Sequence, residues 1–361
     1  MSSETVCFLP TDALTSLITL LRDQGYTVVG PTIDQGAIVY DEVSSSDDLP
    51  RGWTDEQNPG RYRLKEREDN AFFGYVVGPH SWKKFLFPPV TTVATAERTE
   101  AGWEMSTQDD EDIPRYAFLG VRACELAAME IQDRVFLGGP YTDPTYHQRR
   151  NAALIIAVNC TQAAPTCFCT SMKTGPQCHT GFDIALTEVP EGFLVESASE
   201  VGSGIVASLP VQSCTAEQRQ QAEEAVQHAA DQITRRLDTD GIRDLLLDNL
   251  NHEHWQNVAE RCLSCANCTM VCPTCFCSTV DDVQDLTGDH VTRERRWDSC
   301  FNIDFSYMNG GVARDTISSR YRQWLTHKLA SWQDQFGTSG CVGCGRCITW
   351  CPTEIDLTAE V

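Results

Sequence analysis

The chain has 361 residues, of which 41% are hydrophobic, and this length suffices for two domains with cores of their own. Asp and Glu number 51 against 28 Lys and Arg, so the formal net charge is −23. This acidity argues against nucleic acid as a partner, because phosphate groups bind basic surfaces. No apolar run approaches the about 20 residues that span a bilayer, so no membrane span is predicted. We expect a cytoplasmic location, since free thiols suit a reducing compartment.

Residues 1–210 are predicted to form an α/β domain, because short β-forming runs alternate with segments of helical periodicity. A helix is expected to begin at Thr11 or Asp12 and to run through Leu21. The polar segment 41–61, rich in Ser, Pro and Gly, predicts a surface loop. The expected strands are 26–29, 37–40, 116–121 (followed by a helix over 124–136), 154–158, and a hairpin of 182–189 with 193–196.

Residues 211–361 are predicted to form a mainly helical domain, similar to the α-helical ferredoxins. Charged amphipathic patterns predict a helix over 216–237, one or two helices over 241–262 and a long helix over 315–336. The cysteine-rich runs of the chain lie at the ends of these predicted helices.

Eight of the 18 cysteines form two runs of the pattern CxxCxxCxxxCP, which is typical of bacterial proteins with two [4Fe–4S] clusters. Three thiolates spaced two residues apart can surround one cluster from a single loop. The fourth cysteine, directly before proline, points away and ligates the other cluster. The sequence therefore predicts cluster I at Cys262, Cys265, Cys268 and Cys351, and cluster II at Cys341, Cys344, Cys347 and Cys272. The two runs must then lie side by side.

Structural zinc is the main alternative for paired CxxC motifs, because zinc is also held by four thiolates. Zinc sites require neither the identical two, two, three spacing of both runs nor the closing prolines, so the pattern favours iron–sulfur clusters. A disulfide framework fits poorly with so long a chain.

The remaining cysteines suggest a third metal centre. The sequence PTCFC occurs twice, at 165–169 and at 273–277. The alternative is a buried hydrophobic turn, since free cysteine behaves as a small apolar residue. The favoured ligand set follows expected strands whose carboxyl ends meet at one sheet edge, and it comprises Cys124, Cys160, Cys167 and Cys169. The competing set, which stays open, comprises Cys275, Cys277, Cys300 and one cysteine of the first domain.

Motifs for other chemistry are absent from the sequence. There is no phosphate-binding glycine loop and no nucleophile–base pair that would support hydrolysis. The sequence by itself thus favours an electron carrier without a catalytic centre.

Several longer segments carry a family resemblance. In the first domain they are GPHSWKKFLFP at 78–88, GVRACEL at 120–126, DPTY at 143–146 and CFCTSM at 167–172; in the second they are RCLSCANCTMVCPTCFC at 261–277, WDSCF at 297–301, RYRQWLTHK at 320–328 and CVGCGRCITWCP at 341–352. Over most of its length the chain resembles the beta subunits of soluble, NADP-linked nickel–iron hydrogenases, called sulfhydrogenases. It resembles the electron-input subunit of anaerobic sulfite reductase more distantly.

The resemblance implies an iron–sulfur subunit that relays electrons and does not itself activate hydrogen. Its partners would be the large (Ni–Fe) and small hydrogenase subunits together with a flavin- and NAD(P)H-binding subunit. The alternative is the electron-input subunit of a sulfite or sulfur reductase. A scaffold protein with purely structural clusters is a third interpretation.

Overall fold

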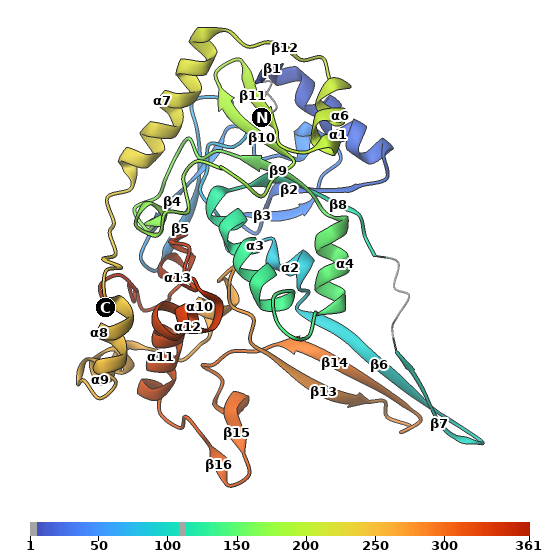
Figure 1. Ribbon diagram of the computed structural model, residues 1–361, viewed down its shortest axis with the longest axis vertical. Helices are drawn as coiled ribbons and strands as arrows, with labels where there is room; N and C mark the ends of the chain where they lie inside the picture. Colours follow the sequence, from blue (N-terminus) through green and yellow to red (C-terminus); the bar gives the residue numbers. More distant parts are fainter. Residues whose placement is uncertain (1–5, 108–112) are drawn as a thin grey trace.

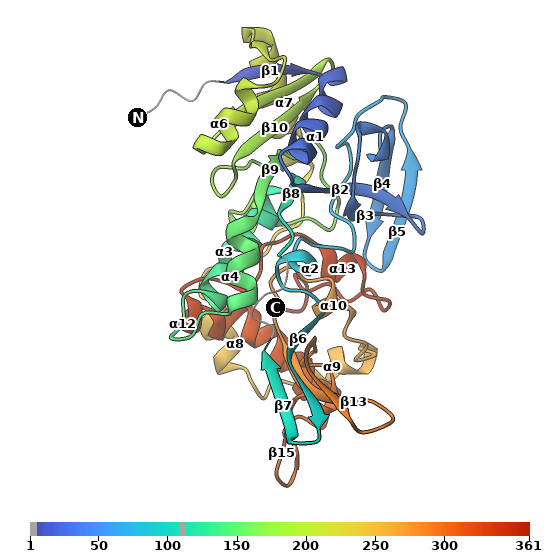
Figure 2. The same ribbon diagram turned by 90° about the vertical axis from the view of Figure 1, so that its right-hand side faces the viewer.

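The computed structural model describes residues 6–107 and 113–361. A large sheet lies at one end of the molecule, both cysteine-rich runs lie below it, and two thin projections extend from the opposite end (Figure 1, Figure 2).

The large sheet has eight strands in the order β12-β1-β11-β10-β9-β8-β2-β3. The central pairs β2–β8, β8–β9 and β9–β10 are parallel, and the flanking pairs are antiparallel. The strands are β1 (Cys7–Pro10), β2 (Thr27–Asp34), β3 (Ala37–Glu42), β8 (Tyr116–Val121), β9 (Leu154–Val158), β10 (Ile184–Val189), β11 (Gly192–Ser197) and β12 (Gln212–Ser213). The α/β prediction is confirmed, as is the hairpin, which is β10 with β11.

Helices cover both faces of this sheet, because successive side chains of its central strands point to opposite faces and are apolar on both. Leu119 and Ile156 pack in the cluster that includes α1 (Leu14–Asp23), whereas Phe118 and Ile155 pack in the cluster that includes α3 and α4. The helices of this part are η1 (Thr11–Ala13), α1, α2 (Lys83–Leu86), α3 (Ala123–Phe136), α4 (Pro144–Ala152), α5 (Cys169–Met172), α6 (Glu200–Ala207) and α7 (Ala216–Gln232). Strands β8 and β9 end just before Cys124 and Cys160.

The loop predicted over 41–61 is wrong for the second half of this segment, which forms β4 (Trp53–Asn58). This strand pairs with β5 (Arg61–Glu66). The first half contains the short helix η2 (Ser46–Asp48). The inward-facing residues of β4 are Asp55 and Gln57, both of which are buried. The strand buries polar side chains and satisfies them with hydrogen bonds, so it lacks the apolar alternation by which strands are recognised.

The helices predicted after residue 210 are present. The helix over 216–237 is α7, which ends at Gln232, and those over 241–262 are α8 (Ile242–Asp248) and α9 (His254–Arg261). The segment 315–336 contains α11 (Ile317–Thr326) and α12 (Trp332–Phe336), with a π-helical segment over His327–Ser331 between them. Two short helices that were not predicted are α10 (Asn267–Met270) and α13 (Arg346–Thr349). The long helix predicted over 315–336 is therefore α11, the π segment and α12 in succession. None of the helices in the described residues is long and apolar enough to cross a membrane.

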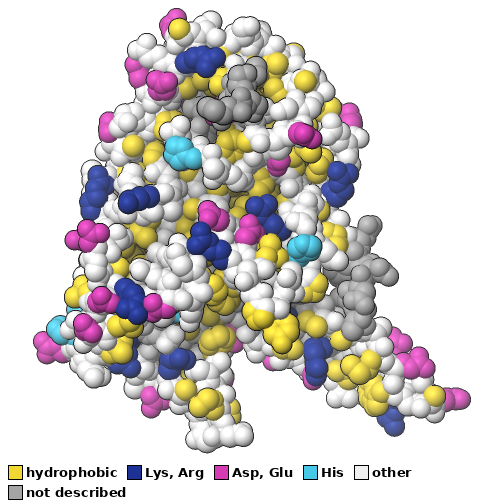
Figure 3. Space-filling view, in the orientation of Figure 1, with side chains coloured by type: hydrophobic (Ala, Val, Ile, Leu, Met, Phe, Trp, Pro, Cys, Tyr) yellow, Lys and Arg dark blue, Asp and Glu magenta, His cyan; other side chains and the backbone are white. Residues whose placement is uncertain are grey.

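A mainly helical second domain is not confirmed, because this part also contains strands. β13 (Ser278–Gln284) and β14 (His290–Trp297) join β6 (Val90–Thr99) and β7 (Gly102–Thr107) in a four-stranded sheet, ordered β13-β14-β6-β7. A second hairpin follows: η3 (Ile303–Ser306), β15 (Tyr307–Met308) and β16 (Gly311–Val312). Both form the projections, on which hydrophobic side chains are visible (Figure 3). The four-stranded sheet combines segments from both sides of residue 210, and a domain boundary there stays a prediction.

Candidate iron–sulfur site

The two cysteine runs adopt the same backbone conformation. Each run has two residues with positive φ at equivalent positions. In the first run they are Ser264 (53°) and Ala266 (66°), which flank Cys265, and in the second run they are Gly343 (65°) and Gly345 (77°), which flank Cys344. A short helix then begins, α10 in the first run and α13 in the second, and the two helices pack together. Both runs thus form the tight loop that a CxxCxxC spacing needs to direct three thiols inward.

The shared conformation predicts opposite effects of two substitutions. Gly345→Ala should lower the free energy of unfolding by about 1–3 kcal/mol or more, because it places a side chain at positive φ and its Cβ would lie 2.5 Å from the Thr166 carbonyl oxygen. Ala266→Gly relieves the same strain in the first run and should not destabilise the protein. Thermal denaturation under anaerobic conditions measures both, and equal effects of the two variants would contradict the prediction.

Four thiols gather at the predicted cluster I. Burial raises the pKa of the Cys268 thiol, and the neighbouring Cys262, Cys351 and Cys265 raise it further. The cavity that these four thiols line is otherwise bounded largely by apolar residues, including Phe301, Tyr321, Trp324, Ile355 and Leu357. Cys265 is exposed, so this site lies at the surface of the protein.

The thiols of the predicted cluster II gather in the same way but deeper. Burial raises the pKa of the Cys347 thiol, and the neighbouring Cys341, Cys344 and Cys272 raise it further. In each site, therefore, the fourth cysteine of one run lies among the first three of the other. The fourth cysteine of each run contacts the threonine two residues further on. Thr274 Oγ1 lies 3.1 Å from the Cys272 sulfur, and Thr353 Oγ1 lies 3.5 Å from the Cys351 sulfur.

Buried donors and cations surround the sulfur atoms, as an anionic cluster requires. Lys328 Nζ lies 3.2 Å from the Cys272 Sγ, and Arg346 lies beside Cys344 and favours its charged form. The backbone N–H of Ser264 donates to Cys262 Sγ and that of Ile355 donates to Cys351 Sγ, each with a donor–acceptor distance of 3.4 Å. Thiolates are the ligands that iron–sulfur clusters select, and metal coordination deprotonates a thiol outright. The residues therefore fit two iron–sulfur clusters.

Lys328 is a candidate functional residue that was not identified from the sequence. It lies in the π-helical segment and is only 3% exposed. It also donates to Thr274 Oγ1 at 3.1 Å and to the Gly340 carbonyl at 2.9 Å. Burial lowers its pKa, but the thiols of Cys272 and Cys275 more than offset this, so the pKa is raised overall. A lysine in the aromatic-rich helix predicted over 315–336, in a chain that has only five lysines, was the available signal.

The favoured third set of cysteines also comes together. Burial raises the pKa of Cys169, and the next causes are the thiols of Cys167, Cys160 and Cys344. Cys124 is buried and has Cys344 and Cys169 among its electrostatic neighbours. The four predicted ligands therefore share one region, next to Cys344 of the second run.

The competing cysteines lie in two pairs. Cys277 lies against Cys300, and Cys275 lies against Cys272 of the first run. Buried Lys83 donates to the Cys275 carbonyl oxygen at 3.1 Å and lies over the Trp297 ring. The groups that act most strongly on the thiols of this set come from the second half of the chain and include no cysteine of the first domain.

Cys277 should be the first of these thiols to react with an alkylating reagent. The Cys300 side chain beside it lowers its pKa to about 7, and the thiolate is the reactive form. We expect the rate of iodoacetamide labelling at Cys277 to rise as the pH increases through about 7 and then to level off. Mass spectrometry of the labelled, cluster-containing protein measures this. Protection of Cys277 under mildly alkaline conditions would contradict the prediction and would favour a ligand role for the competing set.

Within 6–107 and 113–361, no group of three or more His, Cys, Asp or Glu side chains converges closely enough to hold a single metal ion. A [4Fe–4S] cluster differs in that its four thiolates bind four separate iron atoms.

The fold and the thiol loops define an iron–sulfur protein of the two-cluster class. Residues 261–355 match the family described as the 4Fe-4S dicluster domain. The chain is 30% identical over 332 residues to sulfhydrogenase 2 subunit beta of Pyrococcus furiosus, and the match covers 91% of this chain and 89% of that protein. No solved structure matches the chain. The chain belongs to the family of sulfhydrogenase beta subunits.

Proposed function

We propose that this protein is the iron–sulfur electron-transfer subunit of a cytoplasmic hydrogenase complex. It would relay electrons between the large (Ni–Fe) and small hydrogenase subunits on one side and a flavin- and NAD(P)H-binding subunit on the other. The observation that carries this proposal is the crossed arrangement of the two cysteine runs, in which each fourth cysteine lies among the thiols of the other run. Two clusters that exchange ligands in this way lie close together, as electron transfer requires.

The proposed ligands are Cys262, Cys265, Cys268 and Cys351 for cluster I, and Cys341, Cys344, Cys347 and Cys272 for cluster II. When bound, each cluster supplies one-electron redox chemistry. The residues of the chain hold the thiolates, exclude water with apolar walls and place the buried cations Lys328 and Arg346 beside the sulfur atoms. The exposure of Cys265 favours cluster I as the point at which electrons enter or leave.

The native complex should be purified anaerobically and its subunits and metals determined. We expect this chain to co-purify with nickel-containing and flavin-containing subunits, and its EPR spectrum after dithionite reduction to contain signals of interacting [4Fe–4S] clusters. Absence of iron, or clusters that cannot be reduced reversibly, would refute the electron-transfer function.

The second candidate is the electron-input subunit of a sulfite or sulfur reductase, which the more distant resemblance to the corresponding component of anaerobic sulfite reductase favours. The same purification separates the two, because a sulfite reductase complex would contain sirohaem instead of nickel. The dicluster function of this chain would be common to both.

A further inference from the structure

Four cysteines outside the two runs converge where the α/β part meets the second run. Cys124 lies in the first turn of α3, directly after β8, and Cys160 follows the end of β9. Cys167 and Cys169 lie in the loop that continues from Cys160, and Cys169 begins α5. We propose that these four cysteines hold a third [4Fe–4S] cluster, which extends the electron path beyond cluster II; this rests on the dicluster function proposed above.

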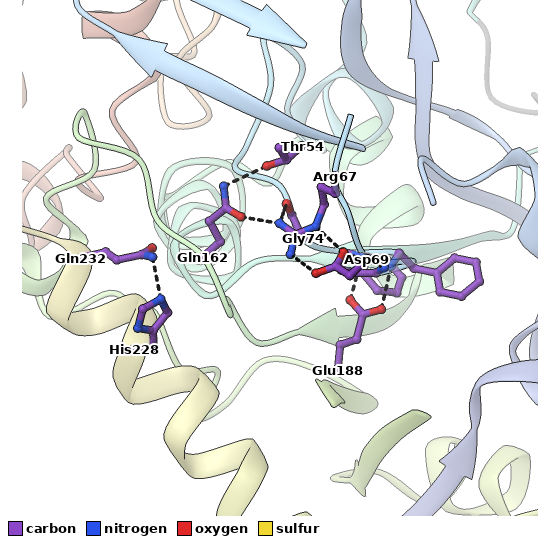
Figure 4. Close-up of polar contacts among 11 residues, drawn as sticks. Thr54, Arg67, Asp69, Gly74, Gln162, Glu188, His228 and Gln232 are labelled. Carbon is purple, nitrogen blue, oxygen red and sulfur yellow. Dashed lines mark hydrogen bonds and ion pairs between the residues drawn. The ribbon is translucent and has the colours of Figure 1, made fainter. Parts of the chain in front are cut away.

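The loop that carries three of these cysteines is held by polar contacts of Gln162 with Arg67 and Thr54 (Figure 4). Gln162 Oε1 accepts from Arg67 Nη1 at 2.7 Å, and Gln162 Nε2 donates to Thr54 Oγ1 at 2.9 Å. The next backbone N–H, of Ala163, donates to Gln232 Oε1 at 2.8 Å. A binding site needs ligands that are fixed in advance by supporting contacts, and this loop has them.

A buried cation without a full set of partners faces the same region. Arg122 is only 1% exposed, and its Nη atoms donate to the backbone carbonyls of Asn159, Phe73 and Tyr75 at 3.2, 2.7 and 3.2 Å. Within the described part of the chain its Nε has no partner. Asn159, whose carbonyl accepts from Arg122, directly precedes Cys160, so the guanidinium lies at the start of the loop that carries this cysteine.

A buried positive charge is costly unless an anion compensates it. Arg122 has the carboxylates of Glu125, Asp55 and Glu188 nearby, and that of Glu125 is also paired with Arg346 at 2.6 Å. Thiolates held by an iron–sulfur cluster at Cys160 and its neighbours would add negative charge beside this cation. The buried guanidinium is therefore compatible with an anionic group at this site.

The proposed third site adjoins cluster II directly. Gly343 of the second run has φ +65°, and a Cβ there would lie 2.7 Å from the Cys169 backbone. Phe168 N donates to the Gly343 carbonyl at 2.9 Å, and Cys344 is an electrostatic neighbour of both Cys124 and Cys169. On the other side, Cys268 of cluster I has Cys272 of cluster II among its neighbours. The order of the clusters is therefore I, II, III.

Electron transfer along this order forms and breaks no covalent bond. In each step one cluster is oxidised by one electron and its neighbour is reduced by the same electron. The flavin or nicotinamide subunit of the proposed complex supplies or removes electrons at one end of the path.

Iron and acid-labile sulfide content of the full chain, purified anaerobically within its complex and then separated, tests the proposal. We expect about twelve iron atoms per chain, the content of three [4Fe–4S] clusters. Cys124→Ala and Cys169→Ala should each reduce this to about eight. The matched control is Cys178→Ala, another buried cysteine of the same part, which should retain the full content. About eight iron atoms in the unmodified chain, unchanged by Cys124→Ala, would overturn the proposal.

Two further variants separate the outcomes. Cys265→Ala removes an exposed ligand of cluster I and should cost about four iron atoms. If the unmodified chain holds about eight and this variant about four, the third cluster fails while the dicluster function stands; if Cys265→Ala loses none, the dicluster assignment itself fails. Loss of one cluster from Cys277→Ala, with none lost from Cys124→Ala, would place the third cluster at the competing set and overturn the proposal.

A redox titration of Arg122→Gln provides a measurement that does not depend on cluster loss. Removing the positive charge beside Cys160 should shift one of three reduction midpoints to a lower potential, because a nearby cation favours the more negative, reduced state. The iron content should stay at about twelve. Three unchanged midpoints would assign Arg122 a purely structural role and remove its support for the proposal.

Discussion

Replacing Glu125 with alanine is expected to lower the free energy of unfolding by about 3–5 kcal/mol, the usual effect of breaking a buried ion pair from one side. Glu125 is 1% exposed and pairs with the fully buried Arg346 at 2.6 Å. Its other carboxylate oxygen accepts from Tyr40 OH at 2.8 Å and from Trp82 Nε1 at 3.0 Å. The variant would leave the buried guanidinium of Arg346 without its counter-charge, and the buried hydroxyl of Tyr40 and indole N–H of Trp82 without their acceptor.

The effect should reach the second cysteine run, because Arg346 lies between Cys344 and Cys347. Arg346 also donates to the carbonyls of Gly78 and His80, both at 2.9 Å, so it fixes the loop of the second run against the α/β part. We therefore expect Glu125→Ala to lose iron from cluster II on gentle warming before it unfolds globally.

Anaerobic thermal denaturation with simultaneous recording of cluster absorbance measures both effects. The control is Glu130→Ala in the same helix, where an exposed pair with Arg134 contributes only about 0.3–0.5 kcal/mol. Glu125→Gln should lie between the two, since the amide oxygen can still accept from Tyr40 and Trp82. A Glu125→Ala protein as stable as the Glu130→Ala protein would show that the pair does not hold the two parts together.

The order of strands and helices in the α/β part was largely predictable. Strands such as 116–121 and 154–158 are buried on both faces, so their sequences are continuous apolar runs that can be recognised. Strand β4 was missed for the opposite reason, since it buries Asp55 and Gln57. The projecting strands β13 and β14 were missed because charged residues such as Asp281 and Arg293 interrupt their apolar pattern, and because β14 pairs with β6, which lies far away in the sequence. Sequence periodicity contains no information about so distant a partner.

The candidate site divides in the same way. Regular spacing alone predicted which eight cysteines belong to the two runs, since the loop geometry is local. The cations that accompany them could not be found from spacing, because Lys328 reaches Cys272 from a segment outside both runs, and the burial of Arg122 and Arg346 is not visible in the sequence. Their roles depend on tertiary contacts, although the rarity of lysine in this chain marked Lys328 as unusual.

Replacing Lys328 with methionine is expected to lower the midpoint potential of the proposed cluster II by up to about 170 mV. A unit charge about 4 Å away contributes about 4 kcal/mol at an effective dielectric of about 20, and about 1.4 kcal/mol corresponds to about 59 mV for one electron. The sign follows from charge: the reduced cluster is more negative, so the ammonium group 3.2 Å from the Cys272 sulfur stabilises it. Without that cation, reduction becomes less favourable.

EPR-monitored redox titration of the cluster-containing protein measures this shift, and Lys328→Arg, which keeps the charge, should restore most of it. The matched control is Lys84→Met, because Lys84 also donates to a backbone carbonyl, of Tyr40 at 2.7 Å, but contacts His80 rather than a thiol. A shift of equal size in both variants would mean that overall charge, rather than the contact with Cys272, sets the potential. A large shift in Lys328→Met alone would identify the π-helical segment as the element that tunes cluster II, since this segment directs a lysine into an apolar interior.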